Sequence, residues 1–254
     1  MRGRAEIQRT RRGGLARALS KLGHCSRSQA AVLIREGLVK LNGRVRRDPE
    51  TPVDLDSDKI VVGERAVLAR EFVYLVLNKP RGVVTTASDE KGRETVYAYL
   101  DKDLPWVAPV GRLDKASEGL LLLTNDSEWA GRILAPECHV EKLYHVQIRS
   151  SDPDVVAKAL SAGIRSEGEF LRARRVAVLR RGRSNAWLEI GLEEGKNRQI
   201  RRMVDGCGAE VLRLVRVAIG RVELGTLAKG KARRLTAVEK AALDGVAADG
   251  PRTS

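Results

Sequence analysis

The sequence predicts an α+β protein in which a small helix-and-hairpin module precedes a larger domain built on a mixed, mainly antiparallel sheet. Residues 15–63 contain two helical stripes and then a tight hairpin signal. From Glu71 onward, short alternating strands outnumber the helices and do not alternate regularly with them, which argues against a parallel sheet. The chain has 254 residues, enough for two domains of moderate size.

Shifts in composition divide the chain into five parts. The first residues are rich in arginine, and the texture changes to short alternating strands from Glu71 onward. We therefore expect a basic tail over residues 1–14, the small module over 15–63, a linker over 64–70, the larger domain over 71–240 and a second tail over 241–254.

Within the small module, the first helix is expected where Leu15 and Leu19 share one face. The second should begin at Ser26, which forms a capping box with Gln29, and should stop at Gly37. The hairpin follows around residues 42–43, an Asn-Gly pair between alternating apolar residues.

The larger domain contains several segments with strand character and two with helical character. One helix should begin near Ser127. The other should begin at Asp152, an N-cap followed by proline, and end at Gly163. Strands are expected over residues 72–78, 120–124, 144–148, 175–179, 187–192 and 211–215.

The charge of the chain points to a polyanionic partner. There are 47 Lys and Arg against 33 Asp and Glu, a net charge of +14, and residues 1–63 alone hold 14 basic and 7 acidic residues. A generically cationic surface is the alternative. In the module, a phosphate-binding surface or a merely solvated face is expected from Arg27, Lys40, Arg44, Arg46 and Arg47.

Cysteine usage and hydropathy exclude several classes. Cys25, Cys138 and Cys207 stand far apart without CxxC spacing, so we expect no disulfide framework, no metal and no other cofactor. Such usage fits a reducing cytoplasm. The longest apolar run, residues 72–77, is too short to span a bilayer, and a monomer is the default expectation.

Two polar loops in the larger domain could carry chemistry. Residues 78–82 close a strand with two cations, among them Lys79, and could grip phosphate or form a surface turn. Residues 111–119 place Asp114 between Arg112 and Lys115, just before an apolar strand. Neighbouring cations favour an ionised, partly desolvated carboxylate that can act as a nucleophile. The alternative is a loop aspartate that caps a turn.

A third segment, residues 194–203, combines glycine with several cations. Asn197 is a candidate N-cap, and Arg198, Arg201 and Arg202 then fall in the first helical turns. Basic residues do not suit the positive end of the helix dipole, and such local conflicts often mark functional sites. A solvated basic helix is the alternative.

These motifs resemble two known families. Three segments of the small module resemble the RNA-binding module named after ribosomal small-subunit protein four. They are Ser26-Arg27-Ser28-Gln29-Ala30, Ile34-Arg35-Glu36-Gly37 and Val39-Lys40-Leu41-Asn42-Gly43. Three further motifs follow in one order: Gly111-Arg112-Leu113-Asp114 with its continuation, Lys142-Leu143-Tyr144-His145-Val146, and residues 194–203. Together they resemble the RsuA-type ribosomal RNA pseudouridine synthases over about residues 72–235.

The resemblance implies a role for each matching residue. Asp114 falls on the catalytic aspartate, Tyr144 on the tyrosine that packs against the target base, and Arg201 on the basic residue that pairs with the aspartate. Arg112 falls where the flipped nucleotide is held, and Ile200 on the apolar residue near the aspartate. Further substrate contacts are expected from Arg198, Arg202, Lys79 and Asn197.

Two departures bear on the substrate. Ser117 replaces the usual threonine and keeps the hydroxyl, while Asn197-Arg198-Gln199 resembles the large-subunit branch. The resemblance thus implies an isomerase that flips and converts one uridine, in large-subunit rRNA rather than small-subunit rRNA, free or in a ribosome assembly precursor. A non-catalytic ribosome-binding or assembly factor is the alternative.

Two further basic features remain, one with two possible interpretations and one that we reject as a functional site. Residues 172–183 hold six arginines, which predict an RNA-contacting hairpin or a solvated one. Residues 225–231 nearly fit a phosphate loop, but Ala232 stands where a Mg²⁺-binding Ser or Thr belongs, so we interpret the match as chance.

Overall fold

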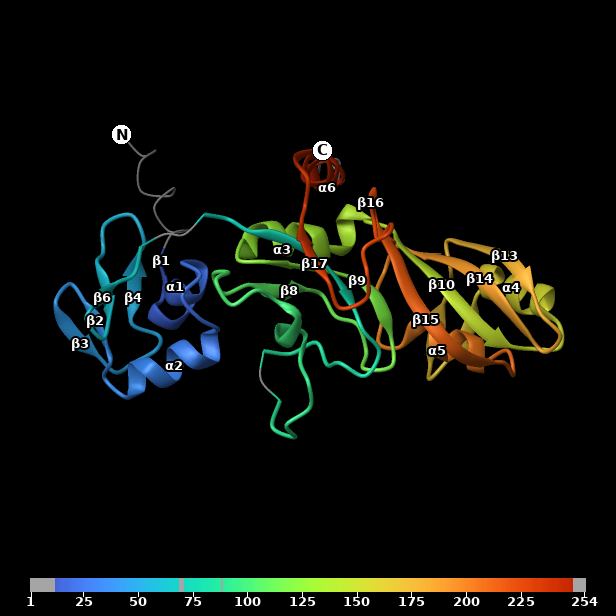
Figure 1. Ribbon diagram of the computed structural model, residues 1–254, viewed down its shortest axis with the longest axis horizontal. Helices are drawn as coiled ribbons and strands as arrows, with labels where there is room; N and C mark the ends of the chain where they lie inside the picture. Colours follow the sequence, from blue (N-terminus) through green and yellow to red (C-terminus); the bar gives the residue numbers. More distant parts are fainter. Residues whose placement is uncertain (1–11, 69–70, 88, 249–254) are drawn as a thin grey trace. The chain divides into compact units, whose positions relative to one another are not determined.

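The structure is a computed structural model that describes residues 12–68, 71–87 and 89–248 (Figure 1). It divides into two compact units. The first holds the described residues up to Val73 together with residues 101–108 and 124–127, and the second holds residues 74–100, 109–123 and the rest of the chain from Glu128 onward. In the described part of the chain, no helix is long and apolar enough to cross a membrane.

The first unit consists of two helices and short strands. The strands form a pair, β1 with β4, and a sheet in the order β3-β2-β5-β6. The elements are β1 (Arg12–Gly14), α1 (Leu15–Lys21), α2 (Arg27–Arg35), β2 (Val39–Leu41), β3 (Arg44–Arg46), β4 (Pro52–Asp54), β5 (Ile60–Val62) and β6 (Arg65–Ala66).

Local signals account for this unit. Both halves of the capping box at Ser26 and Gln29 form, which stabilises the start of α2. Asn42 and Gly43 have φ values of 51° and 79°, as a tight hairpin turn between β2 and β3 requires. Leu15 and Leu19 are fully buried in the unit's core. The two predicted helices and the hairpin are confirmed.

Backbone pairing extends the first unit beyond the expected ends of the module. Residues 12–14, expected in the basic tail, pair with β4, and residues 65–66, expected in the linker, pair with β5. Backbone groups need hydrogen-bond partners whatever the side chains are, so charged segments can complete a sheet. Residues 1–11 lie outside the described part of the chain.

The five basic residues of the module do not share one face. Directly opposite residues of an antiparallel pair point to the same side of the sheet, and neighbours along a strand point to opposite sides. Lys40 is paired with Val45, whereas Arg44 and Arg46 are paired with the buried Leu41 and Val39. Lys40 therefore lies on the opposite face of the hairpin from the two arginines, contrary to the expectation of one basic surface.

The second unit is built on a nine-stranded sheet whose main strand order is β13-β14-β10-β15-β9-β7-β17, with β16 on β15 and β8 on β9. β9 and β15 run parallel, while β10 is antiparallel to both β14 and β15. The sheet is mixed and mainly antiparallel, as predicted. Its strands are β7 (Tyr74–Lys79), β8 (Ala108–Val110), β9 (Glu118–Thr124), β10 (Lys142–Arg149), β13 (Arg175–Arg181), β14 (Asn185–Leu192), β15 (Glu210–Ile219), β16 (Val222–Glu223) and β17 (Ala232–Arg234).

Helices cover the sheet over two apolar cores. One core joins β10, β14 and β15 to α4 (Pro153–Ala162) and α5 (Gln199–Asp205). The other joins β7 and β9 to α3 (Ser127–Leu134) and α6 (Ala237–Ala248). A separate hairpin of β11 (Ile164–Ser166) and β12 (Glu169–Leu171) and the short helices η2 (Val96–Tyr99) and η3 (Pro136–Cys138) complete the described elements.

Residues 237–248 form helix α6, whereas a tail was expected from residue 241 onward. A capping box starts it: the Glu239 amide donates to Thr236 Oγ1, and the Thr236 amide donates to Glu239 Oε2. Leu243 is fully buried, and Asp244 accepts a hydrogen bond of 2.8 Å from Trp129 Nε1. The Thr-x-x-Glu pattern was a sequence signal for this helix.

Shortening Leu243 to alanine should destabilise the second unit by about 2–4 kcal/mol, because the side chain is fully buried and would leave a cavity. The measurement is the free energy of unfolding in urea. Val238→Ala is the matched control, since Val238 lies on the same helix with 79% of its surface exposed, and it should change stability by less than about 0.5 kcal/mol. Equal losses in both variants would show that α6 is not anchored through Leu243.

Candidate active site

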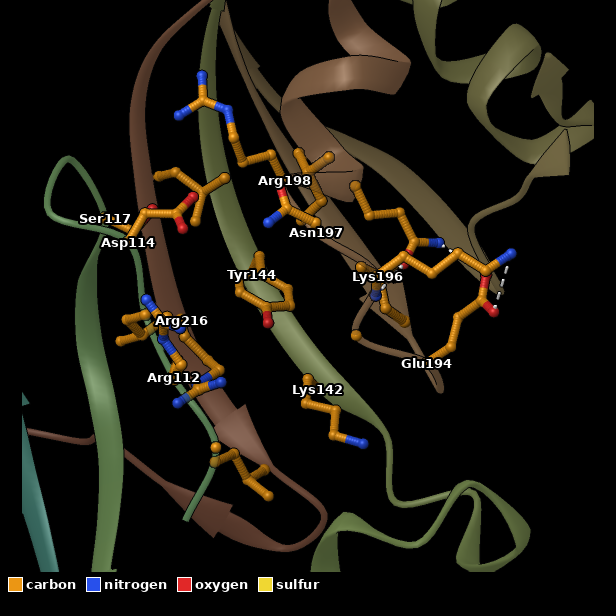
Figure 2. A pocket seen from close by; sticks show the side chains of 18 of the residues that line it. Arg112, Asp114, Ser117, Lys142, Tyr144, Glu194, Lys196, Asn197, Arg198 and Arg216 are labelled. Atoms are coloured by element: carbon orange, nitrogen blue, oxygen red, sulfur yellow. Dashed lines mark hydrogen bonds and ion pairs between the residues drawn. The ribbon is translucent and has the colours of Figure 1, made fainter. Parts of the chain in front are cut away.

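A cleft of about 680 Å³ opens within the second unit. Its walls come from the loop of residues 111–117, the end of α3, strands β10 and β15, and the segment from Leu192 into α5. Figure 2 shows Asp114, Tyr144, Arg112 and Arg216 around one part of this cleft. The cleft also contains the predicted residues Asn197, Arg198, Ile200 and Arg201.

The loop that carries Asp114 is held by its backbone carbonyls. Each carbonyl from Leu113 to Ser117 accepts a hydrogen bond, so the loop has little freedom to shift. The donors are Thr85 Oγ1 to Leu113 at 2.8 Å, Lys79 Nζ to Asp114 at 3.2 Å, the Gly82 amide to Lys115 at 2.7 Å, Arg201 Nη2 to Ala116 at 3.2 Å and Lys79 Nζ to Ser117 at 2.8 Å.

Lys79 holds this loop from inside the protein, whereas it was expected to contact the substrate. Its side chain is fully buried, and its ammonium group donates to the carbonyls of Pro80, Asp114 and Ser117. Those three bonds use every donor of the ammonium group. Burial lowers the pKa of Lys79 to about 8, although Asp114 and Glu118 act in the opposite direction.

The pKa of Lys79 predicts a pH dependence of stability. Because its folded-state pKa lies below its ordinary value of 10.5, the folded state gains stability as pH rises from about 8 to 10 and loses it as pH falls back to about 8, below which this group changes nothing further. The slope from this one group is at most about 1.4 kcal/mol per pH unit. Urea unfolding of wild type and Lys79→Met across that range should show a gain only in wild type. Parallel curves would contradict the burial of a titrating ammonium group.

The carboxylate of Asp114 is the candidate nucleophile. Within the described chain it takes part in no ion pair or side-chain hydrogen bond, although the backbone carbonyl of the same residue is held by Lys79 and the Ser117 amide. The residue is exposed, which differs from the partial burial expected from the sequence, because the loop projects it into the open cleft. A bound base would have to exclude the water around it.

Tyr144 presents an aromatic face to the same cleft. It lies on β10, opposite Arg216 on β15, next to a β-bulge between Leu143 and Tyr144. Its partly buried ring packs against the core beneath α4 and α5. Bulges change the direction of side chains near active sites. Because the ring of Tyr144 is only partly buried, its exposed part can stack on a base.

Arg201 does not form the expected ion pair with Asp114 in the described structure. Its Nη2 donates instead to Ala116, and its buried Nε has no hydrogen-bond partner. Burial lowers the pKa of Arg201, and the nearby Arg198 adds to this effect while Asp114 opposes it. Arg201 thus holds the backbone of the Asp114 loop through Ala116, and its Nε remains a donor without a partner.

Arg216 was missed by the sequence analysis. It lies on β15, lines the cleft and is only 5% exposed. Its Nε donates to the carbonyl of Leu120 at 2.7 Å, but its buried Nη2 has no partner. A buried guanidinium nitrogen without a partner is costly, and an oxygen of a bound substrate could satisfy it.

Gly119 connects the loop of Asp114 to the strand of Arg216. It has a φ of 102°, and a Cβ added there would lie 2.2 Å from the carbonyl oxygen of Arg216. The two residues are partners in the parallel ladder of β9 and β15. Next to it, Glu118 is buried, and ion pairs of 2.6 Å with Arg213 and Lys229 outweigh its burial and hold its pKa below the ordinary range.

The start of α5 differs from the prediction. Arg198, not Asn197, is the N-cap, in a left-handed conformation with a φ of 48°. The buried Gln199 folds back and accepts from the Lys196 amide at 3.2 Å, which draws the chain into this tight entry. Asn197 and Arg198 line the cleft nevertheless (Figure 2).

Arg202 is turned away from the cleft, contrary to its expected role in substrate binding. Its guanidinium group donates to the Ser166 carbonyl and to Glu169, both at 2.7 Å, on the β11–β12 hairpin. Successive helix residues point about 100° apart, and the contacts of Arg202 with the hairpin place it on the side of α5 that faces away from the cleft. Lys142, which was not predicted as a site residue, lines it and donates to the Glu193 carbonyl at 3.0 Å.

Comparisons with known proteins agree with these features. Residues 73–205 match the RNA pseudouridylate synthase family, and residues 14–60 match the S4 domain. The chain is 37% identical over 225 residues to ribosomal large subunit pseudouridine synthase B of Bacillus subtilis, covering 87% of this chain and 91% of the relative. It is 38% identical over 227 residues to an uncharacterized RNA pseudouridine synthase of Aquifex aeolicus, covering 89% and 91%.

A solved structure gives the same result. The crystal structure of a pseudouridylate synthase superimposes with a TM-score of 0.63 at 31% identity, over 91% of this chain and 99% of that one. The family match spans about half of the chain, and the relatives extend the similarity over most of its length. The chain therefore belongs to the RNA pseudouridine synthases, as an RsuA-type enzyme with an N-terminal S4 domain.

Proposed function

We propose that this RNA pseudouridine synthase converts one uridine of large-subunit ribosomal RNA, with Asp114 as the nucleophile. The main support for Asp114 as the nucleophile is the loop that bears it. Five consecutive carbonyls of this loop accept hydrogen bonds, whereas the Asp114 carboxylate faces the cleft without a partner among the described residues. The substrate class is supported by the relative from Bacillus subtilis, whose name specifies the large subunit.

The proposed reaction begins when the target uridine leaves its stack and enters the cleft, at a cost of a few kcal/mol. Stacking on Tyr144 offsets part of that cost, and Arg112, exposed at the cleft, is placed to hold the phosphate backbone. We assign the buried Nη2 of Arg216 to an oxygen of the bound nucleotide.

Asp114 then attacks the uridine, either at the uracil ring or at ribose C1′. The bond between N1 and C1′ breaks, the uracil rotates, a bond between C5 and C1′ forms, and the bond to Asp114 breaks so that its carboxylate is regenerated. The proton on C5 is removed by Tyr144 or a relayed water, and N1 takes up a proton. The sum is an isomerisation that consumes no other reactant.

Tritium release tests this function. RNA transcripts labelled with tritium at uracil C5 lose the label to water when a uridine is isomerised. We expect release from large-subunit rRNA and none from small-subunit rRNA. Release from small-subunit rRNA alone would overturn the substrate assignment. Absence of release from both RNAs and from assembly precursors would favour a non-catalytic ribosome-binding factor.

A further inference from the structure

A second hollow lies on the face of the second unit's sheet that α4 and α5 do not cover. Trp187 on β14 stands between Ala186 and Leu188, which are buried in the core beneath those helices, so strand alternation directs Trp187 to the opposite face. There it borders a hollow of about 380 Å³, together with Leu179, Arg180, Arg213, Val215 and His145. Leu179 is 47% exposed at its edge.

Two guanidinium groups lie over the Trp187 ring. Arg180 Cζ is 5.0 Å and Arg213 Cζ is 5.8 Å from the ring centroid, both within the range of cation–π contacts. The two arginines come from the strands β13 and β15, on either side of the β14–β10 pair. The hollow thus combines an aromatic surface with cations from two directions.

The charge at this hollow is only partly neutralised by the protein. Of the arginine-rich segment around β13, Arg174, Arg175 and Arg181 form ion pairs with acidic residues, whereas Arg180 forms none with any described residue. Arg213 shares Glu118 with Lys229, so two cations meet one carboxylate. Of the six arginines predicted to form an RNA-contacting or a solvated hairpin, three thus form ion pairs, and Arg180 is the member that lines the hollow.

We infer that this hollow binds an unpaired nucleotide of the RNA substrate, outside the active site. The base stacks on Trp187, and Arg180 and Arg213 hold its phosphates. Every base has a face that can stack on an aromatic ring, whereas an acidic peptide would use the two arginines and leave the ring without a role. The inference rests on the proposed RNA substrate and adds a second point of attachment for it.

Binding of a single-stranded oligouridylate of about eight nucleotides, followed by tryptophan fluorescence, tests the inference on the full chain. The measurement is made in a Trp106→Phe background, because Trp106 is partly exposed whereas Trp129 is buried. In that background the protein with Trp187 should be quenched, and Trp187→Phe should lose most of that quenching. Trp187→Ala removes the fluorescent reporter, so its affinity is measured by the anisotropy of an end-labelled oligouridylate, and it should weaken binding about tenfold. Arg180→Gln, an exposed change that leaves the ion pairs intact, should weaken it severalfold and lower the salt dependence by about one phosphate contact.

Arg165→Gln is the charge-matched control, since Arg165 is exposed on β11 and does not line the hollow. Unchanged affinity in both Trp187→Ala and Arg180→Gln, or an equal loss in Arg165→Gln, would overturn the inference. Tritium release by wild type is measured on the same preparation. Release without quenching would refute this site and leave the proposed function standing, whereas quenching without release would do the reverse.

Discussion

Replacing Asp114 with asparagine will abolish isomerisation and leave RNA binding intact. The amide has nearly the same shape as the carboxylate but cannot act as the nucleophile. Its backbone contacts with Lys79 and the Ser117 amide do not depend on the side chain, so the loop should keep its position. We expect tritium release from labelled rRNA to fall about a thousandfold or more, with the dissociation constant for RNA changed less than about twofold.

The matched control is Asp205→Asn, which removes an exposed carboxylate at the end of α5, away from the cleft. It should retain wild-type release. If the Asp114 variant turned over at the rate of this control, the nucleophile would have to be another group. If it lost RNA binding as well, Asp114 would have a role in holding substrate rather than in attacking it.

Replacing Arg216 with methionine should lower kcat/KM about 10- to 100-fold without unfolding the protein. The guanidinium Nη2 is buried without a partner, so the free protein carries a cost that substrate binding would remove. A hydrogen bond to a charged donor is worth about 1.5–3 kcal/mol, which gives that range of rates. Methionine removes the unpartnered Nη2 but also the Nε that donates to the Leu120 carbonyl, so the two effects oppose each other and the free energy of unfolding should change by no more than about 2 kcal/mol.

Steady-state tritium release and urea unfolding together separate the two effects. Arg221→Met, an exposed arginine in the turn after β15, should leave both quantities unchanged. A large loss of stability in the Arg216 variant with a proportionate loss of activity would assign Arg216 a structural role through its bond to Leu120. Unchanged activity would remove it from the substrate site.

The sequence predicted the elements of the fold well because each has a local signal. The capping box at Ser26, the turn at Asn42 and the N-cap at Asp152 all form as expected. Pairing between distant segments has no such signal, which explains why β1 and β6 were missed. Helix α6 was missed although Thr236 and Glu239 spell its start, because its apolar stripe is short.

For the site, motif order brought Asp114, Tyr144 and Arg112 to one cleft, but side-chain direction could not be predicted as well. Lys79 and Arg202 look like surface cations in the sequence, and only tertiary structure shows that they bond to backbone and acidic groups inside the protein. Arg216 was hidden for the opposite reason, because it stands in an apolar strand where a cation has no local explanation.

The close approach of Gly119 to Arg216 has a consequence for altering the specificity of this enzyme. The loop of Asp114 and the strand of Arg216 approach each other through their main chains, with no room for any side chain at position 119. This close approach does not involve Asn197 or Lys196, which line the cleft elsewhere. Libraries that vary Asn197 or Lys196 to seek a new specificity should leave this alignment unchanged, provided that Gly119 is kept constant.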